Sequence, residues 1–101
     1  MKPEEIIEAI RPVIDPEIGV SIIDLGLVYD AQVDDVSNSV KITMTLTSPG
    51  CPAGPEIMSS VEHAVKQNTP YQNVTVELVW EPKWDPREMA SDVAKDLLGI
   101  W

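Results

Sequence analysis

The residue best suited to chemistry in this chain is Cys51, its only cysteine, within SPGCPAGP (48–55). Cys51 precedes Pro52, and proline favours the first turn of a helix, so the pattern predicts Cys51 as the N-cap of a helix. Unpaired amide groups and the positive end of the helix dipole would favour thiolate over thiol there. A helix that begins at Gly54-Pro55 would instead leave Cys51 in a loop, and a small buried residue is the alternative to a functional thiol.

What the chain lacks limits the chemistry open to this thiol. The one histidine, His63, would lie about 18 Å from Cys51 along a shared helix, whereas a catalytic thiol needs its base within about 3 Å. We therefore predict that the protein is not an enzyme. A structural zinc site takes four ligands, usually Cys and His, so a metal on Cys51 would need further ligands from a second protomer, a partner protein or a small thiol. We expect transient metal handling and no tightly bound cofactor.

Carboxylates that could support the thiol lie in predicted loops or at the ends of predicted elements. A carboxylate beside a thiol raises the pKa of the thiol or serves as a hard ligand for iron. The alternative for each of them is to cap a turn or to face water. The candidates are Asp15, Glu17, Asp24 and Glu56.

The three tryptophans gather late in the chain. Trp80 and Trp84 frame the stretch WEPKW, and Trp101 follows near the end of the sequence. Tryptophan is enriched at protein interfaces, so the pattern predicts a docking or dimer surface between a strand and a helix. Packing as a lid over the core is the alternative.

The composition indicates a single domain spanning residues 1–101 with protein partners. The chain carries 17 acidic and 7 basic side chains, a net charge of −10, which repels the phosphate backbone of nucleic acids and anionic membrane surfaces. Protein partners are expected, with a homodimer left open. A single cysteine, the lack of a signal peptide and the lack of a long apolar run predict a cytoplasmic protein.

The elements that must position these residues follow the order α–β–β–α–β–α. This order predicts a two-layer α+β sandwich with helices on one face of a small three-stranded sheet, although the strand order stays open. Residues 15–24 form an aperiodic loop. The expected helices are 3–12, with the stripe Ile6, Ile7, Ile10 and Ile14, then 52–67, and 86–98, with the stripe Met89, Val93 and Leu97; the expected strands are 26–34 and 39–47, paired as a hairpin, and 73–80.

Two separated motifs resemble those of a known family. The stretches DPEIGVSIIDLGLVYD (15–30) and TLTSPGCPAGP (45–55) are similar to the DPE…DLGLV and T-x-T-x-x-x-CP segments of the metal–sulfur cluster biosynthetic family, and residues 79–99 look like its ending. The family includes SufT-like proteins, PaaD-like proteins and the N-terminal domain of some cluster-carrier ATPases. Because no cysteine-rich tail or nucleotide-binding domain follows, the SufT-like form is the expected one.

The resemblance implies a compact domain in iron–sulfur protein maturation. Under this hypothesis the thiol binds or hands over iron or a cluster edge, and the partners are the iron–sulfur assembly machinery or client apoproteins. The alternative is an acidic interaction adaptor without a metal role, in which the tryptophans carry the binding. The residues matched to the family motifs are Cys51 with Thr45, Thr47 and Pro52, and the acids Asp15, Glu17 and Asp24.

Overall fold

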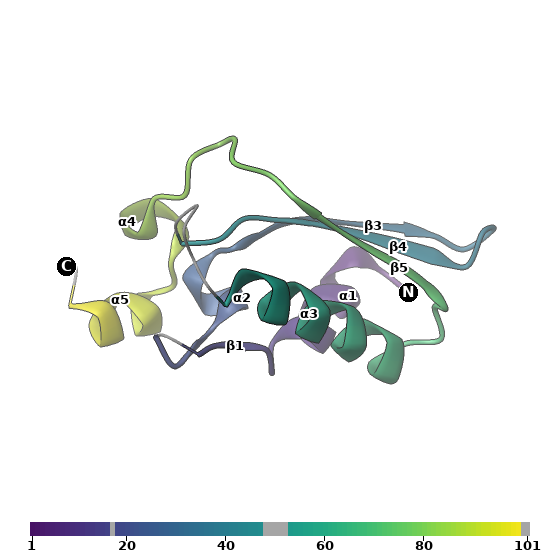
Figure 1. Cartoon of the computed structure of the whole chain (residues 1–101), viewed down its shortest axis with the longest axis horizontal. Helices are drawn as coiled ribbons and strands as arrows, with labels where there is room; N and C mark the ends of the chain where they lie inside the picture. The colour runs from purple at the N-terminus through teal and green to yellow at the C-terminus, as the bar shows by residue number, and fades with distance from the viewer. Residues whose placement is uncertain (17, 48–52, 100–101) are drawn as a thin grey trace.

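The computed structural model describes residues 1–16, 18–47 and 53–99, which form a three-stranded sheet with helices packed on one face and a second sheet of two short strands (Figure 1). The elements follow the order α1–β1–β2–α2–β3–β4–α3–β5–α4–α5. The sheet and the helices α1 and α3 are the two layers of an α+β fold, so the predicted fold class is confirmed. The strand order, which the sequence leaves open, is β3–β4–β5.

Strand β4 is the centre of the three-stranded sheet. It spans Ser39–Met44 and pairs antiparallel with β3 (Val28–Asp34) and parallel with β5 (Asn73–Leu78). The antiparallel pair is the predicted hairpin. A parallel pair needs a crossover, which helix α3 supplies, and the chain therefore leaves β4 and β5 at the same end of the sheet. Both strands end earlier than predicted, at Met44 rather than 47 and at Leu78 rather than 80.

Helices α1 (Pro3–Ile10) and α3 (Gly54–Asn68) cover one face of the sheet and pack against each other (Figure 1). None of the helices in the described part of the chain combines the length and the apolar character needed to cross a bilayer. Helix α1 packs against β3 and α3 against β5, and both helices bury an apolar stripe in the core. The buried side chains are Ile6 and Ile10 of α1, Val40, Ile42 and Met44 of β4, and Ile57, Val61 and Val65 of α3.

The segment predicted as a loop over 15–24 contains regular structure. Strands β1 (Ile14–Asp15) and β2 (Val20–Ser21) pair antiparallel, and the helix α2 (Ile22–Leu25) follows directly. Elements this short show no period in the sequence, because fewer residues than two helical turns are available to repeat a pattern.

Helix α2 has capping groups at both ends. The side-chain oxygen of Ser21 accepts a hydrogen bond from the N–H of Ile23 at 3.2 Å, which is the usual N-cap interaction. Gly26 ends the helix in the left-handed conformation, with φ of 77°, as glycine commonly does. The strand predicted from residue 26 therefore starts at Val28, since Gly26 belongs to the end of the helix.

The C-terminal helix predicted over 86–98 is two short helices, α4 (Pro86–Met89) and α5 (Asp92–Leu98). The break falls at Ser91. Its hydroxyl oxygen accepts a hydrogen bond from the N–H of Ala94 at 3.2 Å and so caps a new helix. Both helices lie at the end of the molecule opposite the β3–β4 turn (Figure 1).

The break changes which side chains are buried. Val93 and Leu97 of the predicted stripe are 63% and 67% exposed, whereas Ala94 is fully buried. That stripe is wrong because it assumes one continuous helix through Ser91. The stripe predicted for the first helix is also too long, because α1 ends at Ile10 and Ile14 is exposed in β1.

A buried tyrosine connects the β3–β4 turn to the segment that enters β5. The hydroxyl group of Tyr71 donates a hydrogen bond to the carboxylate of Asp35. This hydrogen bond, together with burial, raises the pKa of Tyr71 to about 12. The folded protein therefore holds the proton of Tyr71 more tightly than the unfolded chain does.

We predict that stability falls as the pH rises from 10 to about 12, because the unfolded chain loses the tyrosine proton first. Below pH 10 this contribution is fully present. Titration of tyrosinate absorbance, with Tyr71→Phe to assign the signal, measures the shift. The Asp35→Asn variant should move the transition of Tyr71 back toward its ordinary pKa, and an unchanged transition would contradict the assigned cause.

Candidate functional site

A pocket of about 240 Å³ lies where the chain leaves the parallel strands β4 and β5. One wall follows β4 and the other follows β5, and the crossover topology brings both to the same end of the sheet. The backbone pairing continues past the strands, because the N–H of Val79 donates to the carbonyl of Met44 at 2.9 Å. The lining residues are Thr45, Leu46, Thr47, Trp80, Glu81, Lys83 and Trp84.

The first wall is the segment that leads toward the cysteine. Thr45 is almost fully buried, and its N–H donates to the carbonyl of Leu27 at 2.8 Å. Leu46 is buried against Gly54 at the start of α3, where a Cβ atom would come within 2.7 Å of the Leu46 side chain. Thr47 is the last described residue before 48–52. The two described ends that flank Cys51 in the sequence therefore meet beside the pocket.

The start of α3 corrects one prediction. The helix begins at Gly54, with Ala53 as its N-cap and Pro55 in the first turn, so Cys51 is not the N-cap. The alternative start at Gly54-Pro55 is the correct one, because proline occupies the first turn at residue 55 rather than at residue 52. Cys51 itself lies outside the described residues.

The second wall carries two of the predicted tryptophans. The indole N–H of Trp84 donates to the carbonyl of Leu25 at 2.8 Å, which anchors this side chain to α2. Trp80 is 42% exposed. Between them, the carbonyl of Pro82 accepts a hydrogen bond from the hydroxyl of Tyr29 at 2.8 Å. Burial raises the pKa of Tyr29, and a hydrogen bond with Thr45 opposes that rise.

Gly26 lets the C-terminal segment approach helix α2 closely. A Cβ atom on Gly26 would overlap the carbonyl group of Met89, so only glycine fits there. Beside it, the N–H of Ser91 donates to the carbonyl of Asp24 at 2.7 Å. The last turn of α2 thus binds the chain on both sides of α4, and through Trp84 it sets the position of the pocket wall.

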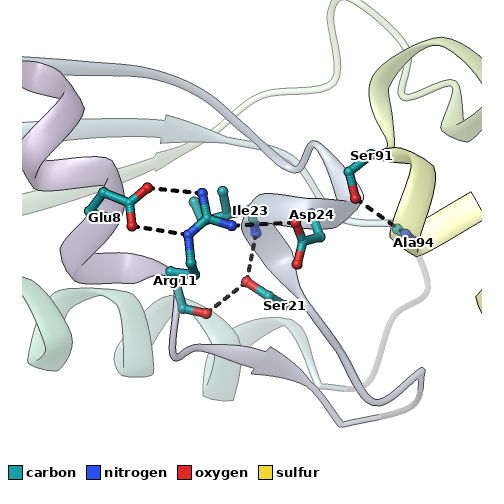
Figure 2. Close-up of polar contacts among 7 residues, drawn as sticks. All are labelled: Glu8, Arg11, Ser21, Ile23, Asp24, Ser91 and Ala94. Carbon is teal, nitrogen blue, oxygen red and sulfur yellow. Dashed lines mark hydrogen bonds and ion pairs between the residues drawn. The ribbon is translucent and has the colours of Figure 1, made fainter.

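The side chain of Asp24 points toward Arg11 at the end of α1 (Figure 2), and Asp24 does not line the pocket. Its carboxylate pairs with Arg11 at 3.3 Å, and Arg11 also forms two hydrogen bonds of 3.0 Å with Glu8. The hydrogen bonds and charge of Arg11 lower the pKa of Glu8. The backbone carbonyl of Arg11 accepts a hydrogen bond from the hydroxyl of Ser21 at 2.7 Å. Asp24 therefore positions α2 against α1 and the C-terminal segment.

The other predicted site residues do not gather at the pocket. Asp15 is buried in β1, and its carbonyl accepts hydrogen bonds from the N–H groups that close the following turn. Glu56 is exposed in the first turn of α3. Glu17 and Trp101 lie outside the described residues. Among residues 1–16, 18–47 and 53–99, no group of three or more His, Cys, Asp or Glu side chains is placed to hold a metal ion.

Sequence reasoning missed several residues that shape the site. Gly26 and Tyr29 hold the C-terminal segment, and Glu81 and Lys83 line the pocket. The pattern of Ser21, four residues and then Gly26 is a compact helix-start and helix-end signal that could have revealed α2. No local signal marks the pairing of Tyr29 with a carbonyl so distant along the chain.

Comparisons with known proteins agree with one another. The sequence profile described as "iron-sulfur cluster assembly protein" matches residues 3–78. The chain is 44% identical over 97 residues to the Fe-S protein maturation auxiliary factor YitW of Bacillus subtilis, covering 96% of this chain and 93% of that protein. It is also 44% identical over 88 residues to the auxiliary factor SufT of Staphylococcus aureus, covering 87% and 98%.

A solved structure has the same fold. The DUF59 domain of unknown function from Bacillus anthracis superposes with a TM-score of 0.88 at 42% identity, covering 98% of this chain and 92% of that one. The likeness extends over both walls of the pocket, because it spans nearly the whole chain.

The close approach at Gly26 generates a prediction for stability. Gly26→Ala should destabilise the fold by about 3 kcal/mol, since it adds a clash with a backbone carbonyl to the strain of a positive φ. Gly19→Ala is the matched control, because Gly19 has φ of 79° but no heavy atom within 4 Å of where an added Cβ would lie. It should cost only about 1 kcal/mol. Urea unfolding measures both, and equal losses would contradict the packing argument.

Proposed function

Because the chain belongs to the iron–sulfur cluster assembly protein family, we propose that it is an accessory factor in the maturation of iron–sulfur proteins. Its cargo is iron or a cluster edge, which the thiolate of Cys51 binds and hands over transiently. The remaining ligands come from the client apoprotein or from another component of the assembly machinery. The protein acts in the cytoplasm and catalyses no reaction of its own.

The observation that carries this proposal is that the described residues on either side of 48–52 lie together beside the pocket. Thr45–Thr47 form one wall, and the side chain of Leu46 packs on Gly54, so the chain enters and leaves 48–52 beside the same cavity. A cavity of about 240 Å³ is smaller than a typical cofactor site. Its size suits one or two side chains of a partner, which would bring the client next to the thiol segment.

The second wall gives this pocket its binding character. Trp80 and Trp84 offer broad apolar surface, and aromatic side chains of this kind dominate the energetics of many protein interfaces. The hydrogen bond to the carbonyl of Leu25 already fixes the side chain of Trp84, so this side chain loses little conformational entropy when a partner binds. A preorganised wall lowers the entropic cost of docking.

We predict that Cys51→Ser abolishes the maturation function while the fold remains intact. The client should lose its cluster to the extent seen when the whole protein is absent, whereas the free energy of unfolding should change by only about 0.5 kcal/mol. Client iron and sulfide content, measured after expression with each variant, is the assay. Ser59→Ala on the exposed side of α3 is the control. Full client cluster content with Cys51→Ser would refute the role of the thiol.

A second candidate function is an interaction adaptor without a metal role, which the exposure of Trp80 favours. Anaerobic reconstitution with iron, sulfide and a small thiol distinguishes the two functions. A maturation factor should develop visible absorption that Cys51→Ser removes, and an adaptor should not. Trp80→Ala should weaken client binding about tenfold under either function, which corresponds to about 1.4 kcal/mol, and should leave that absorption unchanged.

A further inference from the structure

The two edge strands of the three-stranded sheet, β3 and β5, differ in how well they are protected against pairing with another chain. An unpaired edge strand can pair with another chain, and proteins usually block this with bulges, charges or proline. Strand β3 has such features, because its register shifts between Val28 and Asp30 and the exposed carboxylates of Asp30 and Asp34 lie along it. Pairing of a further strand with β3 is therefore disfavoured.

Strand β5 is less protected, because its one charged side chain, that of Glu77, is paired with Lys41 of β4. It stays in register with β4 from Asn73 to Leu78 and contains no proline and no bulge. Its inward row, Val74, Val76 and Leu78, is only half-buried, whereas the matching row of β4 is fully buried. Apolar surface therefore remains at this edge for a further strand to cover.

We propose that β5 pairs with β5 of a second copy of this chain and forms a homodimer with one continuous sheet. The sequence of the strand is self-complementary about Thr75, since it reads Asn-Val-Thr-Val-Glu from 73 to 77. In an antiparallel pair centred there, Thr75 opposes its own copy, Val74 opposes Val76, and Asn73 opposes Glu77. Threonine pairs, pairs of β-branched residues, and an amide opposite a carboxylate are all favourable cross-strand neighbours.

The backbone directions fit this register. The N–H groups of Asn73 and Val79 point toward the β4 side, where they donate to the carbonyls of Asn38, just before β4, and of Met44. Because the backbone N–H and C=O groups of successive residues point to opposite sides of a strand, the N–H groups of Val74 and Val76 point away from β4, toward the open edge. These two residues oppose each other in the proposed pair, so they exchange reciprocal hydrogen bonds, and Thr75 falls at a non-hydrogen-bonded position where side chains are closest.

The charge at this edge also favours a second copy over a basic partner strand. The only carboxylate of β5, Glu77, pairs with Lys41 of β4 at 2.7 Å. The strand is thus locally neutral, although the whole chain carries a net charge of −10. In the proposed pair, no like charges oppose each other across the axis. The strand also has no excess negative charge that would favour a cationic partner.

Thr75→Glu tests the proposal in the full-length protein. Two carboxylates would meet at the axis, while within one copy the new side chain lies beside Lys41, with which Thr75 is in register. Sedimentation equilibrium should show a monomer–dimer equilibrium whose dissociation constant this variant raises at least about tenfold. Gln32→Glu is the matched control, because Gln32 lies beside Lys41 on the other edge, and it should leave the constant unchanged.

Amide hydrogen exchange provides a second measurement that does not depend on a variant. The N–H groups of Val74 and Val76 should become protected as the protein concentration rises, whereas those of Thr75 and Glu77 should be protected throughout. A wild-type protein that stays monomeric to about 1 mM, or a dimer that Gln32→Glu weakens and Thr75→Glu does not, would overturn the proposal. Exchange at Val74 and Val76 that does not change with protein concentration would also overturn the proposal. Neither measurement involves a client, so the result is independent of the proposed function.

Discussion

The pocket depends on how one short helix satisfies its own backbone. Helix α2 is too short for its last carbonyl groups to find partners within the helix, and the C-terminal segment supplies them. The carbonyl of Asp24 accepts from Ser91, and the carbonyl of Leu25 accepts from the indole of Trp84. This pairing requires the two backbones to come together, and the missing Cβ of Gly26 makes that approach sterically allowed. Burying these carbonyls without partners would cost roughly 1–3 kcal/mol each.

A topological constraint places the other wall. Because β4 and β5 are parallel, the connection between them must cross the sheet, and α3 makes that crossing. The segment 48–52 with Cys51 therefore belongs to a strand-to-helix connection at the carboxyl end of a parallel pair. Binding sites in α/β proteins commonly lie at this end of the strands. The walls meet there because the chain must leave both strands in the same direction, whatever the identity of the loop residues.

Much of the architecture could be predicted from the sequence, because the two larger helices and the three main strands have clear periods. The alternation of Val40, Ile42 and Met44 identifies the central strand, and these side chains are fully buried. The break in the last helix could not be predicted, because a contact between residues distant in the sequence determines it. Ser91 breaks the last helix because its N–H binds Asp24, a residue far away in the sequence, and no local pattern contains that contact.

The same limit applied to the candidate site. The acids Asp15 and Asp24 were predicted to support the thiol because they lie in a predicted loop. In the structure, Asp24 instead pairs with Arg11, and Asp15 is buried in a small sheet. Thr45, Thr47, Trp80 and Trp84 were singled out separately, and the parallel pairing of β4 and β5 brings them together. Residue type could identify them, but only the sheet topology shows that they line one cavity.

The β5 pairing constrains where cluster ligands can come from. Trp80 lies about 17 Å along the chain direction from Thr75, taking roughly 3.3 Å per residue. Two antiparallel copies would therefore hold their Trp80 walls about 33 Å apart, at opposite ends of the joined strands. A metal–sulfur distance is only about 2.3 Å, so one cluster cannot reach both pockets. In such a dimer each pocket acts independently, and the ligands that complete a metal centre must come from the client or the assembly machinery rather than from the second copy.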